Sequence, residues 1–348
     1  RDNIDQEDGI MVGKKRLGAL IAAAIIGTSL IGCGSSAGTN GTSNEGGQEV
    51  KNIGVVQLVQ HDALDSANKG FVDALKEKGY EDGKNIKIDQ QNAQGEQANA
   101  QTITKQFADS KKDLIFAVAT PAAQAAYNAT KDIPIVFTAV TDPVAAEIAK
   151  DWKSSGTNVT GTSDKVPVED QIKLLKQLLP ETKTIGVIYN TSETNSIIQV
   201  EELKAAAEKD GLGVKEIGVT NVNEINQNLA SALNDIDVLY TPTDNTVASA
   251  YSLVGKLCID AKKPIIGAEE AVVTKGGLAT IGIDYYKLGK EAGYKAVEIL
   301  EGKKPSDIEI STLSEMSFTI NTDVATKLGI NIPEDIRKNA NLVTGGVE

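Results

Sequence analysis

The side chains that most often carry catalysis or bind metal ions are scarce in this sequence. His61 is the only histidine, and the two cysteines are Cys33 and Cys258. One histidine cannot form a multi-histidine metal site, and two cysteines cannot form a four-cysteine zinc site or a disulfide framework. No nucleophile can be assigned to His61 from the sequence, and neither phosphate-binding glycine motif is present in its required context. We therefore expect a protein that is not an enzyme and holds no metal ion or cofactor.

Polar residues recur directly after the predicted strands. In open α/β sheets, ligands bind beyond the carboxyl ends of the strands, so these residues are candidates for a binding site. The candidates from the first half are His61, Thr120, Thr141, Asp142 and Asp164, and those from the second half are Asn190, Asn195, Asp244, Glu269 and Asp284. Most of these residue types also cap helices, so a purely structural role remains open for each.

The two halves offer different chemistry at these positions. Hydroxyl groups and helix N-termini, which favour anions, dominate the first half, as at Thr120 and Thr141. The second half adds the carboxylates Asp244, Glu269 and Asp284. This asymmetry suits a zwitterion whose carboxylate is held by one half and whose ammonium is held by the other.

Hydrophobic periodicity indicates the elements that position these residues. In the first half, β-rich runs at 53–57, 86–91, 114–119 and 133–138 alternate with helical patterns near 66–78, 97–109 and 121–130. The second half repeats the plan: Ile53-Gly54-Val55-Val56 corresponds to Ile185-Gly186-Val187-Ile188 at an offset of 132. We expect an α/β protein with two doubly wound, Rossmann-like lobes built on parallel sheets.

Composition narrows the possible partners. The chain has 348 residues, enough for two domains, and 35 Lys and Arg against 48 Asp and Glu give a net charge of −13. A chain this acidic is poorly suited to neutralising phosphates, which argues against nucleic acid as a partner. Hydrophobic residues make up 41% of the chain, which excludes wholesale disorder.

The N-terminal residues have the pattern of an export signal. Residues 1–10 precede Met11, the expected start, and residues 14–16 are basic. Residues 17–31 are apolar but shorter than a membrane span, and Leu30-Ile31-Gly32-Cys33 resembles the lipobox of bacterial lipoproteins. We expect 1–32 to comprise upstream residues and a signal peptide, and 33–50 to comprise a lipidated Cys33 and a flexible tether. That lipid would anchor the protein to the outer face of the bacterial cytoplasmic membrane.

Beyond the tether, the sequence resembles a solute-binding lipoprotein of an ABC transporter, with the type I periplasmic-binding-protein fold. The resemblance covers about 51–332. Its ordered motifs are QLVQHDALD at 57–65, ATP at 119–121, TAVTDP at 138–143, VTGTSD at 159–164 and GVIYNTSETNS at 186–196. These motifs are similar to those of the ABC substrate-binding subfamily associated with tryptophan and tyrosine uptake.

The resemblance implies a particular organisation. Three crossovers would join the lobes, with 51–162 and 285–304 in lobe 1, and 163–284 and 305–348 in lobe 2. The protein would be a monomer that binds a small amino acid, best guessed to be Trp, Tyr or Phe, between the lobes. It would deliver this ligand to ABC permease and ATPase subunits.

The resemblance also suggests roles for the candidate residues. Thr120 and Thr141 would hold the ligand carboxylate, and Asp244 is the first choice for its ammonium, followed by Glu269 and Asp284. His61, Asp164, Asn190 and Asn195 would line the rest of the site. Asp142 lies beside Thr141 at a predicted helix start.

Other functions share the same fold. A binding protein or sensor-linked receptor for a sugar, nucleoside or signalling molecule would differ only in its cleft. A lipid-anchored hydrolase is disfavoured because no nucleophile–base pair is apparent. Aromatic residues make up only 4% of the chain, so few are available to stack on an aromatic ligand.

Overall fold

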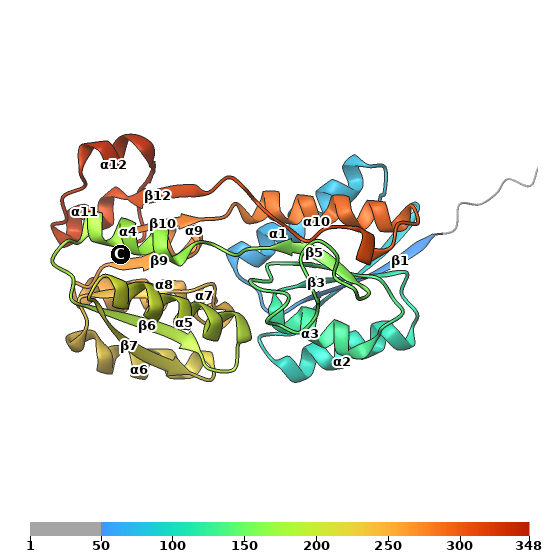
Figure 1. Ribbon diagram of the computed structural model, residues 1–348, viewed down its shortest axis with the longest axis horizontal. Coiled ribbons are helices and arrows are strands. Elements are labelled where there is room, and N and C mark those ends of the chain that lie inside the picture. Colours follow the sequence, from blue (N-terminus) through green and yellow to red (C-terminus); the bar gives the residue numbers. More distant parts are fainter. Residues whose placement is uncertain (1–49, 348) are drawn as a thin grey trace, which may run out of the picture. The chain divides into compact units, whose positions relative to one another are not determined.

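Two α/β lobes make up the part of the chain that the structure describes (Figure 1). The computed structural model describes residues 50–347, so the predicted signal peptide, Cys33 and nearly all of the tether lie outside the described residues. The elements of the first lobe are β1 (Lys51–Gln57), α1 (Asp62–Glu77), β2 (Ile86–Asn92), α2 (Gln97–Asp109), β3 (Leu114–Val118), α3 (Thr120–Ala129), β4 (Ile135–Thr138), β5 (Val159–Ser163), α10 (Tyr285–Leu300), the 3-10 turn η3 (Pro305–Asp307) and β11 (Ser311–Thr312).

The second lobe takes the middle of the chain and its C-terminal part. Its elements are α4 (Val168–Leu178), β6 (Thr184–Asn190), α5 (Thr194–Lys209), β7 (Gly213–Val219), η1 (Val222–Glu224), α6 (Ile225–Ala232), η2 (Leu233–Asp235), β8 (Val238–Thr241), α7 (Asn245–Ala248), α8 (Tyr251–Asp260), β9 (Ile265–Gly267), α9 (Glu270–Thr274), β10 (Ala279–Gly282), β12 (Ser317–Asn321), α11 (Thr322–Leu328), α12 (Glu334–Asn339) and β13 (Asn341–Val343).

Each lobe is built on one sheet. The first sheet has the strand order β11-β5-β4-β3-β1-β2, and the second has the order β13-β12-β10-β9-β8-β6-β7. All pairs in the first sheet are parallel, and the second contains one antiparallel pair, β10 with β12. The order β4-β3-β1-β2 has its counterpart in β9-β8-β6-β7, which confirms the predicted pair of doubly wound lobes.

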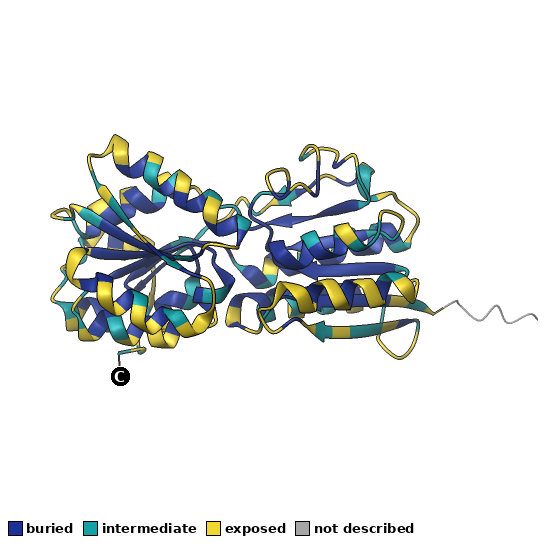
Figure 2. Cartoon of the chain, turned by 90° about the horizontal axis from the view of Figure 1, so that it is seen from below, coloured by how far each residue is buried: buried dark blue, intermediate teal, exposed yellow. Residues whose placement is uncertain are grey.

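The central strands are buried because helices cover both faces of each sheet, whereas edge strands such as β2 and β7 are partly exposed. Figure 2 shows the strands of both lobes mostly dark blue and the outer faces of the surrounding helices yellow. Every residue of β3 and β4 is buried, which explains their continuous apolar sequences LIFAV and IVFT. The sheets therefore supply rigid strand ends that can hold side chains of a site in place.

The chain passes between the lobes three times. It crosses after β5, between β10 and α10, and between β11 and β12. We expected 305–348 to lie in the second lobe, but β11 pairs with β5, and Ile308 and Ile310 are buried in the core of the first lobe. The third crossover therefore falls between β11 and β12, several residues later than expected, because burying these two isoleucines keeps this segment on the first lobe.

Close packing of α1 against α10 fixes two segments that begin near the site (Figure 1). Gly70 and Gly289 let the helices approach: a Cβ at Gly289 would lie 1.8 Å from Ala67 O, and one at Gly70 would lie 2.2 Å from Tyr286 O. No side chain larger than hydrogen fits at either point without moving a backbone. Because α1 starts after His61 and α10 starts at Tyr285, this contact holds both residues in place.

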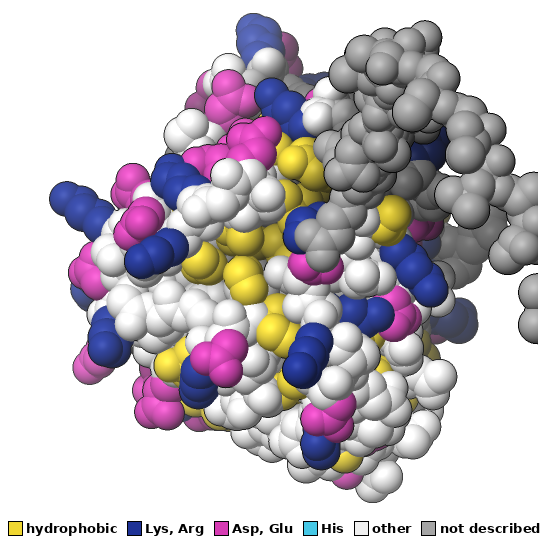
Figure 3. Space-filling view, turned by 90° about the vertical axis from the view of Figure 1, so that its right-hand side faces the viewer, with side chains coloured by type: hydrophobic (Ala, Val, Ile, Leu, Met, Phe, Trp, Pro, Cys, Tyr) yellow, Lys and Arg dark blue, Asp and Glu magenta, His cyan; other side chains and the backbone are white. Residues whose placement is uncertain are grey.

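Charges of both signs cover the surface in the view of Figure 3. Lysine and arginine side chains are interspersed there with aspartate and glutamate, and apolar side chains are visible between them across the middle of the view. Within residues 50–347, no helix combines the length and apolar character needed to cross a membrane.

Candidate functional site

The carboxyl ends of strands from both sheets bring most of the predicted site residues together. Eight of the ten candidates are buried: His61, Thr120, Thr141, Asp164, Asn190, Asn195, Asp244 and Glu269. They follow strands β1, β3, β4, β5, β6, β8 and β9 or begin the helices after them. Because these residues lie at strand ends of both lobes, their burial indicates that the lobes cover one another there.

Direct hydrogen bonds join the lobes at this point. Thr141 Oγ1 of the first lobe lies 3.0 Å from Thr243 Oγ1 of the second. His61 Nε2 lies 3.4 Å from Asn245 Oδ1, and Gln199 Nε2 donates to Thr141 Oγ1 at 3.4 Å. These bonds require closed lobes, because each links a loop of one lobe to a loop or helix of the other.

Asp244 is completely buried and braces the second lobe. Its Oδ1 accepts from Val247 N at 2.8 Å and thereby caps α7, while Oδ2 accepts from Asn190 N and Ser196 Oγ, each at 2.6 Å. Burial, with a contribution from the nearby carboxylate of Glu193, raises the pKa of Asp244 to about 7. Asp244 was our first choice for pairing with a ligand ammonium, but its two carboxylate oxygens already accept three hydrogen bonds from the protein.

Glu193 is a buried carboxylate that the sequence analysis did not select. Its Oε1 accepts from the backbone N and Oγ1 of Thr246, each at 3.0 Å. Its Oε2 accepts from Asn245 Nδ2 at 2.5 Å and from Asn195 Nδ2 at 3.2 Å. Glu193 thus fixes the start of α7 and both asparagine amides, a structural role that also sets how those amides face the site.

Asp164 lies where the chain first leaves the first lobe. Its Oδ1 accepts from Thr141 Oγ1 at 3.0 Å, and its Oδ2 accepts from Tyr285 Oη at 2.8 Å. Tyr285 begins α10 at the second crossover, so this hydrogen bond ties two crossovers together. Burial raises the pKa of Asp164 above its usual range.

Several buried polar atoms at this site have no hydrogen-bond partner. Within residues 50–347, eight buried side-chain atoms lack one, and two of these belong to Asn68 and Asn158, away from the interlobe strand ends. Of the other six, the hydroxyl groups of Thr241 and Tyr251 lie near each other, and the remaining four atoms are His61 Nδ1, Thr120 Oγ1, Asn195 Oδ1 and Glu269 Oε2. Leaving such groups unpaired costs about 1–3 kcal/mol each, so their clustering at one place indicates a site that a polar molecule completes.

The electrostatics of this cluster favour a cation. Four carboxylates are buried here, those of Asp164, Glu193, Asp244 and Glu269, whereas no lysine or arginine is buried anywhere in residues 50–347. Burial, together with the neighbouring carboxylates, raises the pKa of Glu269 well above its usual range. Burial also lowers the pKa of His61 to about 4, so its imidazole is neutral at pH 7 and supplies no positive charge to these carboxyl groups.

Three predicted residues are engaged elsewhere. Asp142 is half-buried, and its Oδ1 accepts from the backbone N of Val144 and of Ala145. The Asn190 side chain bonds Thr246 and Ser192 within the second lobe. Asp284 caps α10, and its side chain is 42% exposed, so it lies outside the buried cluster.

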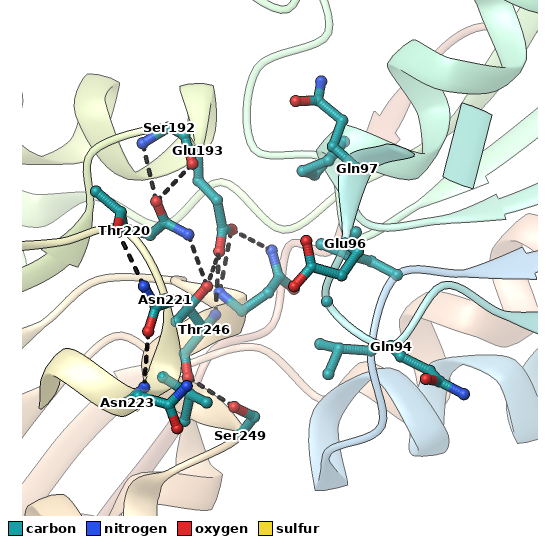
Figure 4. A pocket seen from close by; sticks show the side chains of 17 residues that line it. Gln94, Glu96, Gln97, Ser192, Glu193, Thr220, Asn221, Asn223, Thr246 and Ser249 are labelled. Atoms are coloured by element: carbon teal, nitrogen blue, oxygen red, sulfur yellow. Dashed lines mark hydrogen bonds between the residues drawn. The ribbon is translucent and has the colours of Figure 1, made fainter. Parts of the chain in front are cut away.

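A polar pocket of about 580 Å³ lies beside the cluster, between the lobes (Figure 4). Figure 4 shows Glu96 of the first lobe pointing toward the second, while Gln94 points away. The wall on the second lobe includes Ser192, Glu193, Thr220, Asn221, Asn223, Thr246 and Ser249. The presence of Glu193 in this wall connects the pocket to the buried network and adds polar side chains along one edge of the interlobe site.

Sequence reasoning also missed Gln199, Thr241, Thr243 and Tyr251. Thr241 and Thr243 lie at or just beyond the end of β8, the same position that singled out the other candidates. Tyr251 is the first residue of α8, and Gln199 lies inside α5, so no strand-end signal marks either. Within the described residues, no group of three or more His, Cys, Asp or Glu side chains is arranged to hold a metal ion.

Comparison with known proteins gives consistent matches over the described region. Residues 52–344 match the family model for ABC transporter substrate binding protein. A tyrosine-binding protein of Clostridioides difficile (strain R20291) is 49% identical over 323 residues, which are 91% of this chain and 93% of that protein. The crystal structure of an ABC domain from Streptococcus pneumonia in complex with L-Trp is 43% identical, with a TM-score of 0.82, and the match covers 85% of this chain and all of that one.

A further structure bears on the closed arrangement. The ligand-free, open structure of a substrate binding protein with adhesive properties from Clostridium difficile is 50% identical, and the match covers 85% of this chain and 100% of that one, but its TM-score is only 0.65. The L-Trp complex has the lower identity and the higher TM-score. The described residues are thus closer to the ligand-bound form than to the open form, in agreement with the hydrogen bonds between the lobes.

These findings confirm the resemblance recognised in the sequence. Substrate-binding proteins of ABC transporters act outside the cytoplasm and bind a small molecule without converting it, so the protein is not an enzyme. Both the family match and the matches to whole proteins span the two lobes. The chain belongs to the ABC transporter substrate binding protein family.

Proposed function

We propose that this protein binds an aromatic amino acid between its lobes and delivers it to an ABC importer. The observation that carries this proposal is the unpartnered, buried Glu269 Oε2 in a cluster of carboxylates without a buried lysine or arginine in the described residues. An ammonium group supplies the missing positive charge and donors. The relatives that bind tyrosine and L-Trp support an aromatic amino acid as the ligand.

The free atoms of the cluster divide between the two ends of a zwitterion. Glu269 takes the ammonium, with the charges of Asp164 and Asp244 acting from nearby. Thr120 takes the carboxylate, because its free hydroxyl lies in the first turn of α3, whose N-terminus favours an anion. Thr141, our other expected carboxylate partner, already donates its hydroxyl proton to Asp164.

The ligand can be tested by a thermal-shift screen of protein that has been unfolded and refolded to remove bound molecules. The panel contains the twenty amino acids, common sugars, nucleosides and polyamines. A ligand at 100 times its Kd adds about 2.7 kcal/mol of stability, which raises the Tm by several degrees. We expect a response to Tyr, Trp or Phe. A response confined to sugars or nucleosides would contradict the proposed ligand.

We also propose that lipidated Cys33 anchors a monomeric protein to the outer face of the cytoplasmic membrane, where it meets the permease and ATPase subunits of its importer. The lipobox-like sequence that ends at Cys33 supports this anchor. Expression of the full chain and of Cys33→Ser in a Gram-positive host, followed by fractionation, tests it. The native chain should remain with the membrane and Cys33→Ser should appear in the medium, whereas equal membrane retention would contradict the anchor.

A further inference from the structure

The hydrogen bonds around His61 determine which of its ring nitrogens carries the proton. Asn245 Nδ2 donates to Glu193 Oε2 at 2.5 Å, so the other amide atom of Asn245, Oδ1, faces His61 Nε2 at 3.4 Å. A carbonyl oxygen only accepts, so Nε2 must carry the proton. The opposite nitrogen, Nδ1, then holds a bare lone pair. Burial lowers the pKa of His61 to about 4, so the ring has no second proton at neutral pH.

This bare acceptor is buried without a donor. His61 is 8% exposed, and Nδ1 has no hydrogen-bond partner. It belongs to the same group of unpartnered interlobe atoms as Glu269 Oε2. An unpaired acceptor in a closed site is costly, and a donor on the bound ligand removes that cost.

Different carboxylates act on His61 and on Glu269. The carboxylates that act on His61 are Asp65 and Asp62 of its own helix. Those that act on Glu269 are Asp164, Asp244 and Glu193. His61 and Glu269 thus have different charged neighbours, so the ammonium and the side chain of one ligand would meet different groups at the two residues.

We propose that His61 Nδ1 accepts a hydrogen bond from an O–H or N–H group in the ligand side chain, so that the site prefers tyrosine and tryptophan to phenylalanine. This inference rests on the proposed function and adds a residue that sets specificity. A site built to pair with a hydroxyl group rejects the analogue that lacks it, because the buried acceptor is then left unpaired. Phenylalanine has the shape of tyrosine but no side-chain donor.

Two variants of His61 separate the roles of its nitrogens. In His61→Gln, the amide lies at the level of Nε2 and can keep the bond to Asn245, but no acceptor remains at the position of Nδ1. In His61→Asn, the amide lies at the level of Nδ1, so an acceptor is kept while the bond to Asn245 is lost. Calorimetric titration of the purified protein and both variants with Tyr, Trp and Phe gives the Kd values.

We expect the native protein to bind Tyr at least about tenfold more tightly than Phe. In His61→Gln that ratio should fall to near one, mainly through weaker Tyr and Trp binding. In His61→Asn all three ligands should weaken, because closure is impaired, while the Tyr to Phe ratio stays near its native value.

The outcomes that overturn the inference differ from those that overturn the proposed function. Equal affinities for Tyr and Phe in the native protein, or a native ratio in His61→Gln, overturn the role of Nδ1. A ratio lost in His61→Asn as well assigns the preference to the bond with Asn245 and also overturns it. Absence of binding by any of the three amino acids overturns the proposed function, and this inference with it.

Discussion

Replacing Glu269 by Gln should weaken ligand binding without weakening the fold. Glu269 is 3% exposed, and its Oε2 has no hydrogen-bond partner in the closed site. Burial and nearby carboxylates raise its pKa, which means that the ionised side chain is unfavourable in the protein without ligand. Gln has nearly the same shape and no charge, so it removes this unfavourable burial.

The loss of affinity follows from the pair that Glu269 would form. A hydrogen bond between charged groups contributes about 1.5–3 kcal/mol. Since every 1.4 kcal/mol corresponds to a factor of ten, Glu269→Gln should raise the Kd for the amino acid roughly 10- to 150-fold. The Tm without ligand should stay the same or rise. Titration calorimetry measures the first quantity, and scanning calorimetry of the stripped protein measures the second.

Glu270→Gln is the matched control. It removes the same charge one residue along the chain, from a half-buried side chain that contacts Thr319 Oγ1 at 3.3 Å on β12. We expect its Kd to remain within about twofold of the native value, since its carboxylate is not one of the buried four. An unchanged Kd in Glu269→Gln, or equal losses in the two variants, would refute the pairing of Glu269 with the ammonium. A fall in Tm without ligand would show instead that Glu269 stabilises the fold.

Three further predictions concern protons, packing and the buried thiol. Because the pKa of Asp244 is raised to about 7, an arriving ammonium should displace protons from the buried carboxylates. Affinity should therefore fall as the pH is lowered from 8 to 6, and calorimetry in buffers of different ionisation enthalpy should show net proton release; net uptake would contradict this. Gly289→Ala places a Cβ 1.8 Å from a backbone carbonyl oxygen and should lower the free energy of unfolding, measured in urea, by about 1–3 kcal/mol. The control Lys287→Ala changes an exposed side chain on the same helix and should alter this free energy by at most about 0.5 kcal/mol. Similar effects of the two variants would argue against tight packing of α1 on α10. Cys258 is the only free cysteine among residues 50–347, and burial raises the pKa of its thiol to about 12. This thiol should therefore resist a thiol reagent at pH 8 until the protein is unfolded. Rapid labelling of the native protein would contradict its burial.

Most of the fold could be predicted because its signals are local. The β-rich run at 53–57 lies within β1, and the helix expected near 97–109 is α2, with the same bounds. The third crossover could not be placed in the same way. Ile308 and Ile310 look like residues of any buried strand, and only the assembled core shows that they pack on the first lobe.

The buried cluster between the lobes could be anticipated from the sequence, but the hydrogen bonds of each carboxylate in it could not. Asp244 and Glu269 both follow strands and both precede helices, so their local patterns are alike. They differ because Asn190 N and Ser196 Oγ, brought in from β6 and α5, fill the hydrogen-bonding positions of Asp244. Residues distant in the sequence therefore determine which carboxylate oxygen is left without a hydrogen-bond donor, and local sequence patterns do not reveal them.

A crystal structure of the protein with tyrosine tests the central claim most directly. The distance to measure is that between the ligand ammonium nitrogen and Glu269 Oε2. We predict that tyrosine lies between the lobes with this distance at about 2.7–3.2 Å, the range of an N–H···O hydrogen bond. Tyrosine bound outside the interlobe site, or bound there with its carboxylate toward Glu269, would contradict the account.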